Sequence, residues 1–256
     1  MIHTMTEHFA SQGETTHFGY RDVPEAAKAS LVGRVFDSVA PRYDLMNDLM
    51  SLGIHRLWKN TLIEVLSPRP EMALLDVGGG TGDLALRFLK RNGGRVTVVD
   101  INEGMLAQGR DRALDQGVLN GVTWVRGDAE NLPIEEASAD AFTIAFCIRN
   151  VTHIERALAE ARRVLKPGGR FLCLEFSKVT IPSLKQLYDA YSFGVLPLLG
   201  GCIAGDREAY EYLAESIRRF PDQQAFAGMI NDAGLSQTQV RNLSGGIVAL
   251  HSAWRT

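Results

Sequence analysis

The sequence predicts an α/β fold in which helices cover both faces of a mostly parallel, seven-stranded sheet and an N-terminal helical lid lies against it. Two observations support this prediction. From Ala73 onward, short apolar runs alternate with stretches whose apolar residues recur at helical spacing, and the connections between them are short. Such alternation indicates parallel strands with helices on both faces. The last two apolar runs have no helix between them, which favours an antiparallel finish to the sheet.

The strand candidates, in chain order, are ALLDV, RVTVVD, VTWVRGD, AFTIAFCI, RFLCLEF, LSQTQVRNL and GGIVALHSAWR. Between the fourth and fifth of these, residues 153–165 bring Ile154, Leu158 and Leu165 onto one apolar face of a helix. We expect this helix to end at the sequence KPGG, because Pro167 cannot continue it and the glycines permit a turn. This order of strands and helices makes the predicted fold Rossmann-like.

The chain is expected to form one domain with two additions. Residues 1–25 are polar and are expected to be a flexible N-terminal arm. Residues 26–256 form the single domain. Within it, residues 26–70 show helical periodicity and form the lid, and residues 177–226 form a helical insertion before the last two strands.

Composition excludes several classes of function. The net charge is −3, with no basic stripe, so we expect no nucleic-acid partner. Cys147, Cys173 and Cys202 each lie in an apolar stretch, which indicates buried free thiols in a reducing compartment. The six histidines show no metal-ligand spacing, so no metal is expected.

Neither the N-terminus nor the most apolar run indicates export or membrane insertion. MIHTMTEHFASQGETTHFGY lacks the basic and apolar regions of a signal peptide. FGVLPLLGGCIAG is too short, and too rich in Gly and Pro, to span a bilayer. We therefore expect a soluble, cytoplasmic protein.

The stretch LLDVGGGTGDLALRF leads from a buried strand through glycines into a helix. A dinucleotide fingerprint requires Gly-x-Gly-x-x-Gly. Gly78 and Gly80 fit it, but the third position is Asp83, whose carboxylate would repel a pyrophosphate. The loop instead has an acid, Asp76, two residues before its first glycine.

This loop resembles the cofactor loop of class I S-adenosylmethionine-dependent methyltransferases. That cofactor has no phosphates and carries a cationic sulfonium and a zwitterionic methionine end. Glycines allow the backbone to approach it closely, and a nearby acid suits its ammonium group. The resemblance implies cofactor contacts at Asp76, Gly78 and Gly80, with a hydroxyl hydrogen bond from Thr81.

Positions at the ends of the next two strands agree with this resemblance. Asp100 ends the second strand, where a carboxylate can accept hydrogen bonds from both ribose hydroxyls. Asp128 can take the adenine amino group, and the Ala129 N–H can reach a ring nitrogen. Open α/β sheets bind ligands at this carboxyl edge. Taken singly, each position could be only a turn residue, but the ordered set predicts S-adenosyl-L-methionine as methyl donor.

Two long segments, FDSVAPRYDLMNDLMSLGIHRLWK and RVLKPGGRFLCLEFSK, resemble the signature segments of the ubiquinone/menaquinone biosynthesis C-methyltransferases. The resemblance extends to TTHFGY, IRNVTH and YEYLAESIRRFPDQ, and so covers nearly the whole chain. It implies methylation of a ring carbon in a polyprenylated hydroquinone: 2-polyprenyl-6-methoxy-1,4-benzoquinol, demethylmenaquinol or both. One departure is Ala145, where some members have a serine assigned to the cofactor.

The implied chemistry needs alignment and a proton acceptor. A ring carbon becomes nucleophilic when the adjacent hydroxyl loses its proton, and it then attacks the methyl group in line with the departing sulfur. Arg149 and Asn150 follow the fourth strand and are expected to face the methyl group, since an arginine there is costly unless a polar or anionic group meets it. From the lid we expect Tyr43 and His55 to act on the acceptor. His55 could equally satisfy backbone groups at a helix start, and Tyr43 could equally serve packing.

The segment LYDAYSFGVLPLLGGCIAGDREAYEYL allows two interpretations. It could pack into the core as a helical hairpin, because exposed apolar patches are uncommon on monomers. Alternatively, because the substrate's isoprenoid tail is apolar, the segment could line a tail channel or form a homodimer face. In that case we expect weak, reversible association with a membrane surface, at the inner face of the cytoplasmic membrane.

Three other functions remain open. The nearest is a methyltransferase of the same fold acting on another lipid or on a small aromatic acceptor. An NAD(P)-dependent oxidoreductase is disfavoured by Asp83. A binding module without catalysis is disfavoured by the intact set of cofactor positions and by the polar lid.

Overall fold

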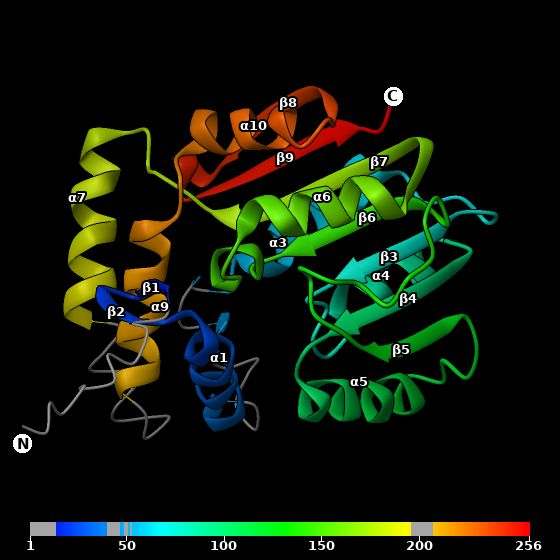
Figure 1. Cartoon of the computed structure of the whole chain (residues 1–256), viewed down its shortest axis with the longest axis horizontal. Coiled ribbons are helices and arrows are strands. Elements are labelled where there is room, and N and C mark those ends of the chain that lie inside the picture. Colours follow the sequence, from blue (N-terminus) through cyan, green and yellow to red (C-terminus); the bar gives the residue numbers. More distant parts are fainter. Residues whose placement is uncertain (1–13, 40–46, 49–50, 52, 196–206) are drawn as a thin grey trace, which may run out of the picture.

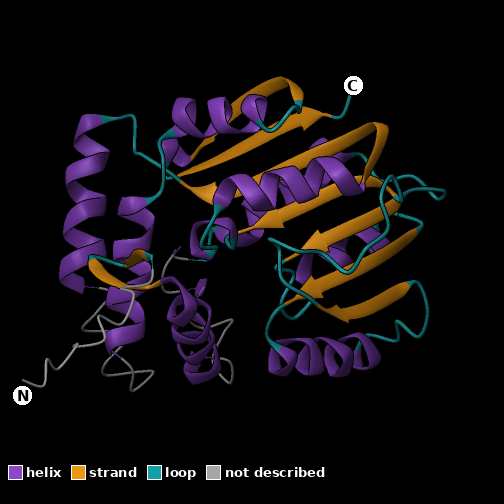
Figure 2. Cartoon of the chain, in the orientation of Figure 1, coloured by secondary structure: helices purple, strands orange, loops and turns teal. Residues whose placement is uncertain are grey.

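The computed structural model describes residues 14–39, 47–48, 51, 53–195 and 207–256. Its main body is a twisted sheet between two layers of helices. A second group of helices lies beyond the carboxyl ends of the parallel strands of that sheet (Figures 1 and 2). The chain ends in the sheet, next to the strand that precedes the helical insertion.

The main sheet has seven strands in the order β5-β4-β3-β6-β7-β9-β8. Neighbouring strands are parallel except around β9, which is antiparallel to both β7 and β8. The predicted mostly parallel sheet and its antiparallel finish are confirmed. The strands are β3 (Ala73–Val77), β4 (Arg95–Asp100), β5 (Val122–Arg126), β6 (Ala139–Ala145), β7 (Leu165–Phe176), β8 (Ser236–Leu243) and β9 (Val248–Trp254).

Helices cover both faces of this sheet, as predicted. Along β3, Leu74 packs into one apolar cluster with residues of α3, α4 and α5, whereas Leu75 and Val77 pack into a second cluster with residues of α6 and α10. Successive side chains of a strand point to opposite faces, so a strand covered on both faces is buried throughout, as β3 is. The helices are α3 (His55–Leu66), α4 (Asp83–Lys90), α5 (Glu103–Asp115), α6 (Ile154–Val164) and α10 (Gln223–Asp232).

The sequence KPGG ends α6 as expected but lies inside β7. The helix stops at Val164, and β7 begins at Leu165. Leu165 pairs with Ala139 and Arg170 pairs with Ala141, so the residues between Leu165 and Arg170 form an irregularity in the ladder. Pro167 and the two glycines therefore interrupt a strand that starts earlier than predicted.

The stretch that we expected to be a loose arm contains a packed hairpin. Strand β1 (Thr15–Phe18) pairs with β2 (Arg21–Pro24) and leads directly into α1 (Glu25–Val39). Phe18 is buried, and its ring stacks on Tyr212 of α9 (Arg207–Arg219) at a centroid distance of 4.1 Å. Burial of this aromatic ring gives the hairpin a hydrophobic anchor, so residues 15–24 are not a loose arm.

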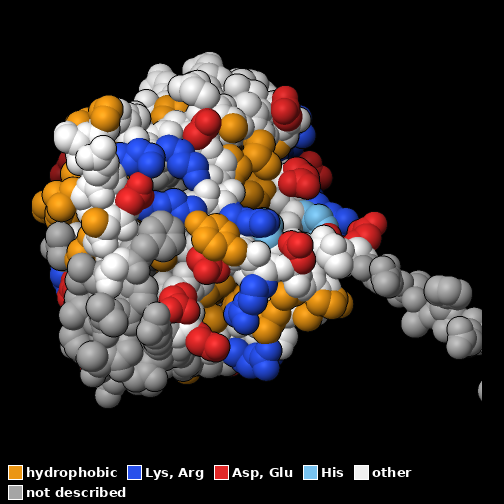
Figure 3. All heavy atoms as spheres, turned by 90° about the vertical axis from the view of Figure 1, so that its left-hand side faces the viewer, with side chains coloured by type: hydrophobic (Ala, Val, Ile, Leu, Met, Phe, Trp, Pro, Cys, Tyr) orange, Lys and Arg blue, Asp and Glu red, His pale blue; other side chains and the backbone are white. Residues whose placement is uncertain are grey.

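Helix α1, the hairpin, α9 and α7 (Pro182–Ala190) lie beyond the carboxyl ends of the parallel strands (Figure 1). Figure 3 views the molecule from the side of α7, where hydrophobic and basic side chains are mixed on the surface. On α7, Leu187 is 70% exposed. The centre of the predicted insertion, together with Cys202, lies outside the described residues. Among the helices that are described, none has the length and apolar character needed to cross a membrane.

Candidate active site

A cavity of about 880 Å³, its open mouth included, lies at the carboxyl edge of the sheet. Its floor comes from the loops after β3, β4, β5 and β6, and α1 contributes Ala29, Val32, Gly33 and Phe36 as an apolar wall. A smaller cavity of about 350 Å³ shares Gly78 and Phe146 with it. The two cavities are therefore neighbours along the glycine loop.

The glycines after β3 are required by the backbone and by close packing. Gly78 and Gly80 have φ values of +61° and +54°, which other residues adopt only with strain. A Cβ on Gly78 would lie 2.2 Å from Cys147 Sγ. Both glycines line the main cavity, so the loop brings bare backbone against any ligand there.

Asp100 supports this loop from the end of β4. Its Oδ2 accepts a hydrogen bond from the Gly80 N–H at 2.8 Å, and its Oδ1 accepts one from the Asn102 N–H at 2.9 Å. Burial raises the pKa of Asp100, while these backbone bonds act to lower it. The side chain lines the main cavity and keeps lone pairs for hydroxyl donors of a ligand.

Asp76 is fully buried and lines the smaller cavity. Its Oδ1 accepts a hydrogen bond from Thr143 Oγ1 at 2.7 Å. Its Oδ2 has no hydrogen-bond partner among the described residues. Burial raises the pKa of Asp76 to about 7, although the Thr143 hydrogen bond acts to lower it. Because buried polar atoms are nearly always paired, this oxygen is suited to a cationic donor from a ligand.

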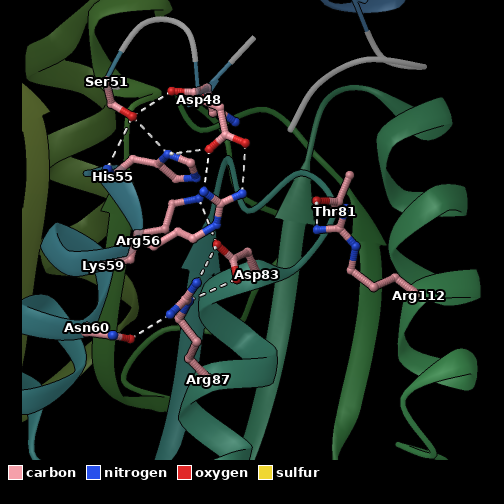
Figure 4. A network of polar contacts seen from close by, with 11 residues as sticks. Asp48, Ser51, His55, Arg56, Lys59, Asn60, Thr81, Asp83, Arg87 and Arg112 are labelled. Atoms are coloured by element: carbon pink, nitrogen blue, oxygen red, sulfur yellow. Dashed lines mark hydrogen bonds and ion pairs between the residues drawn. The ribbon is translucent and has the colours of Figure 1, made fainter. Parts of the chain in front are cut away.

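Thr81 lies beside Asp76 in the smaller cavity and does not line the larger one. Its Oγ1 accepts a hydrogen bond from Arg112 Nη1 at 3.0 Å (Figure 4). The hydroxyl hydrogen is still available to a ligand. Ala145, the departure noted in the sequence, also lines the smaller cavity, with a methyl group where a hydroxyl would add a polar contact.

Asp128 and Ala129 follow β5 and line the main cavity, together with Asp100. Asp128 Oδ1 accepts a hydrogen bond from the Glu130 N–H at 2.9 Å, which orients the carboxylate within its turn. The structure thus brings the predicted residues of three strand ends around one cavity.

The 3-10 turn Ile148–Asn150 after β6 separates the two residues predicted there. Arg149 is buried, and its Nη1 donates to Glu175 Oε1 at 2.9 Å and to the Phe146 carbonyl at 2.6 Å. Asn150 lines the main cavity, and its Oδ1 accepts a hydrogen bond from Tyr212 Oη at 2.9 Å. The anionic group that Arg149 was expected to need is Glu175, and the side chain that reaches the cavity is Asn150.

His55 begins α3 and is not among the residues that line either cavity. Its Nδ1 lies 2.9 Å from Ser51 Oγ and 3.6 Å from Asp48 Oδ1 (Figure 4). Burial, with nearby Lys59, lowers the pKa of His55 to about 4, so the ring is neutral at pH 7. The other predicted lid residue, Tyr43, lies outside the described residues.

An ion-pair network that sequence reasoning missed links α3 to α4. Lys59 Nζ donates to Asp83 Oδ2 at 3.0 Å, and Arg87 Nε donates to Asp83 Oδ1 at 2.9 Å (Figure 4). Burial acts to raise the pKa of Asp83, but Lys59 and Arg87 together lower it to about 2. Because its charge is paired, Asp83 repels an anion less than the sequence alone suggested. The i,i+4 spacing of Asp83 and Arg87 was the available signal.

Other lining residues carry weaker sequence signals. Met105 and Cys147 line the cavity, as do Ile101 and Glu130, but each resembles an ordinary core or turn residue in the sequence. Tyr212 lies in the overlap of two of the segments considered in the sequence, but neither segment indicates a contact with the cavity. No group of three or more His, Cys, Asp or Glu among the described residues is arranged to hold a metal ion.

Comparison with solved structures agrees with the observed fold. An S-adenosylmethionine-dependent methyltransferase from Thermotoga maritima, described as a possible histamine N-methyltransferase, superposes with a TM-score of 0.64 at 22% identity, covering 87% of this chain and 99% of that chain. Phosphoethanolamine N-methyltransferase 2 of Haemonchus contortus, solved in complex with S-adenosyl-L-methionine, gives 0.57 at 16% identity, covering 77% and 52%. At these identities the likeness shows the fold alone.

Comparison of sequences is more specific. The ubiquinone/menaquinone biosynthesis C-methyltransferase UbiE of Paracoccus denitrificans is 57% identical over 241 residues, covering 94% of this chain and 96% of that protein. The mitochondrial 2-methoxy-6-polyprenyl-1,4-benzoquinol methylase of Danio rerio is 51% identical over 281 residues, covering 96% and 86%. The model of the ubiE/COQ5 methyltransferase family matches residues 23–255. The chain therefore belongs to the ubiE/COQ5 methyltransferase family.

Proposed function

We propose that this protein transfers a methyl group from S-adenosyl-L-methionine to a ring carbon of a polyprenylated hydroquinone in ubiquinone/menaquinone biosynthesis. The acceptor is 2-polyprenyl-6-methoxy-1,4-benzoquinol, demethylmenaquinol or both, which are the chemistries that the names of its relatives describe. The observation that carries the proposal is one cavity with a carboxylate-and-glycine edge, suited to a nucleoside, and an apolar wall from α1, suited to a ring with a greasy tail.

The residues around the cavity fit the methyl donor. When bound, S-adenosyl-L-methionine supplies the methyl group, and its sulfur keeps the electron pair of the broken bond. Asp76 receives the ammonium group with the oxygen that lacks a partner among the described residues. Asp100 accepts hydrogen bonds from the ribose hydroxyls, Asp128 accepts one from the adenine amino group, and the Ala129 N–H donates to a ring nitrogen.

The acceptor ring lies between this edge and α1. Val32 and Phe36 of α1 offer an apolar, water-excluding surface, and Asn150 offers a polar contact to a ring oxygen. The ring hydroxyl must lose its proton before the ring carbon attacks, and the ring then releases the hydrogen of that carbon as a proton. Holding the ring carbon in line with the methyl group supplies much of the rate enhancement.

Arg149 has a supporting role in this proposal. Its charge is paired with Glu175, and it holds the Phe146 carbonyl at the start of the turn that carries Asn150. It acts on the quinol by keeping this turn in place, or through one water molecule, and it remains protonated throughout. Tyr43 and His55 stay as proposed proton acceptors from the lid. Burial lowers the pKa of His55 to about 4, so its ring is neutral at pH 7 and is a weak base.

We further propose that the protein takes its substrate from a membrane surface, as a peripheral protein at the inner face of the cytoplasmic membrane. The exposed Leu187 of α7 supports this, since it flanks the apolar segment that continues the insertion. Lys185 lies on the same helix, where it donates to Asp189 Oδ2 at 2.9 Å, and its largely exposed side chain can still attract anionic headgroups. A homodimer formed through this face is the alternative use of the same surface.

Quinone profiling by mass spectrometry of a strain that lacks this protein tests the proposed function. We expect demethylated quinone precursors to accumulate, and the precursor's ring identifies the benzoquinol or naphthoquinol pathway. Complementation with the wild-type chain should restore the methylated quinones, and complementation with the Asp100→Ala variant should not. A normal quinone profile in the deletion strain would instead favour a different lipid or aromatic acceptor.

A further inference from the structure

The side-chain amide of Asn150 has its oxygen hydrogen-bonded within the protein, whereas its nitrogen has no partner among the described residues. Oδ1 accepts the hydrogen bond from Tyr212 Oη at 2.9 Å. Nδ2 is buried and has no hydrogen-bond partner among the described residues. Asn150 is 8% exposed and lines the main cavity. An unpaired buried donor in a ligand cavity indicates that a ligand acceptor completes its hydrogen bonding.

Tyr212 is held on several sides, so its hydroxyl has a defined position. It is 3% exposed on α9 and stacks against Phe18 of β1 with an interplanar angle of 16°. Burial raises the pKa of the Tyr212 hydroxyl, while Arg149 acts to lower it, so the hydroxyl keeps its proton at neutral pH. It therefore donates its hydrogen to the amide oxygen of Asn150.

We propose that Tyr212 is a positioning residue for methyl transfer: its hydroxyl holds the Asn150 amide so that the Nδ2 amino group donates to the ring oxygen beside the carbon to be methylated. This inference rests on the proposed function. A donor to that oxygen favours the deprotonated quinol, because hydrogen bonding to the charged form of an acid lowers its pKa. A rotated amide would present Oδ1 instead, and this acceptor would favour the neutral hydroxyl.

Several ionisable groups lie near Tyr212 and Asn150, and no variant of the test replaces any of them. Arg149, Glu175 and Cys147 act on the Tyr212 hydroxyl, and burial raises the pKa of the Cys147 thiol so that it stays protonated. Asp128 and Glu130 line the cavity that Asn150 faces. A shift that appears in Tyr212→Phe, but neither in Tyr210→Phe nor on adding Tyr212→Phe to the Asn150→Ala background, is therefore assigned to the hydrogen bond between Tyr212 and Asn150.

The test is the pH profile of methylation of a short-tailed benzoquinol, measured anaerobically with purified full-length protein. For Tyr212→Phe we expect kcat to fall about tenfold with KM for the quinol within about twofold. The rising limb of the kcat profile should move by about one unit to higher pH. In an Asn150→Ala background, the same tyrosine substitution should cause no further shift, because the two residues act as one unit.

Tyr210→Phe is the matched control, since Tyr210 is a buried tyrosine on the same helix. It should leave the profile at its wild-type position, and thermal melting of all variants reports their stability. An unchanged profile in Tyr212→Phe overturns the inference, whether or not its kcat or melting temperature falls. Absence of quinol methylation by the wild type instead overturns the proposed function, so the two failures are distinguishable.

Discussion

Asp76 is a buried residue whose protonation is coupled to ligand binding in this account. Burial raises its pKa to about 7 from the ordinary aspartate value of 3.8, so the free protein carries a proton on Asp76 below neutral pH. This raised pKa contributes stability that is present below pH 3.8 and is lost as the pH rises through about 7. An ammonium group needs the carboxylate form. Binding must therefore expel the proton.

We predict that the affinity for S-adenosyl-L-methionine falls as the pH drops below about 7, by up to about tenfold per pH unit. Calorimetry in two buffers of different ionisation enthalpy should detect a proton released on binding near pH 6. Asp76→Asn should bind weakly at every pH and release no proton. Affinity that does not change across this range would show that Asp76 is already ionised or does not meet the ligand.

Asp100 should be the most sensitive position for cofactor binding. Its carboxylate supports Gly80 and lines the cavity, so Asp100→Ala removes the ribose contact and the anchor of the glycine loop. We predict a loss of affinity of about a hundredfold or more for S-adenosyl-L-methionine and its demethylated product, measured by calorimetry. Asp115→Ala, an exposed aspartate at the end of α5, is the matched control and should bind normally. Normal binding by Asp100→Ala would contradict the assignment.

Residues at strand ends could be predicted from the sequence, whereas those in the turn after β6 could not be told apart. Asp100 ends β4 and Asp128 follows the end of β5 in a parallel sheet, and topology alone places such residues at one edge. Arg149 and Asn150 are adjacent in a tight turn, so one faces the interior and the other the cavity. Which one does so depends on Glu175, which is distant in sequence and which no local pattern identifies as a partner.

Helix α1 forms the apolar wall of the main cavity, and a simple nucleotide site would need no such wall. Gly33 lies in the middle of that helix and lines the cavity, and a Cβ built there meets no atom within 4 Å. A larger side chain at this position should therefore extend into the space for the acceptor ring without straining the helix.

We predict that Gly33→Leu raises KM for the quinol about tenfold, because one large side chain takes up space meant for the acceptor ring. The affinity for S-adenosyl-L-methionine should stay within about twofold of the wild-type value. Gly228→Leu is the matched control, because Gly228 lies in α10 and its Cβ also meets no atom within 4 Å. Both variants should keep or slightly raise the melting temperature, since a helical glycine is replaced by a good helix former. An equal change of KM in both would show that α1 is not the acceptor wall.

Helix α7 is the element through which membrane binding is tested. Leu187→Asp should reduce co-sedimentation with anionic vesicles and lower activity on long-tailed quinols more than on short-tailed ones, because its exposed leucine is proposed to enter the interface. Leu119→Asp is the matched control, since Leu119 is 74% exposed in the loop before β5. If the two variants behave alike, the surface of α7 has no special role in taking up the substrate.

At the scale of the whole molecule, alternating periodicity was sufficient to predict the sheet and its covering helices. Local patterns were insufficient where a short segment owes its structure to a distant partner. The hairpin at residues 15–24 is one case, because its polar sequence forms strands around Phe18, which packs on Tyr212 almost two hundred positions later in the chain. Long-range burial of a single aromatic residue leaves no periodic signal.

Carboxylates and glycines, an apolar wall from α1 and an amide donor without a partner among the described residues surround one cavity, where we propose that a quinol ring is methylated. The most direct test incubates purified protein with S-adenosyl-L-methionine carrying a ¹³C-labelled methyl group and reduced, short-tailed benzoquinol or demethylmenaquinol. We predict a ring-bound ¹³C methyl signal by NMR with at least one acceptor, matched one for one by the demethylated cofactor. Bound cofactor with no labelled carbon on either ring, or label on a ring oxygen, would contradict the account.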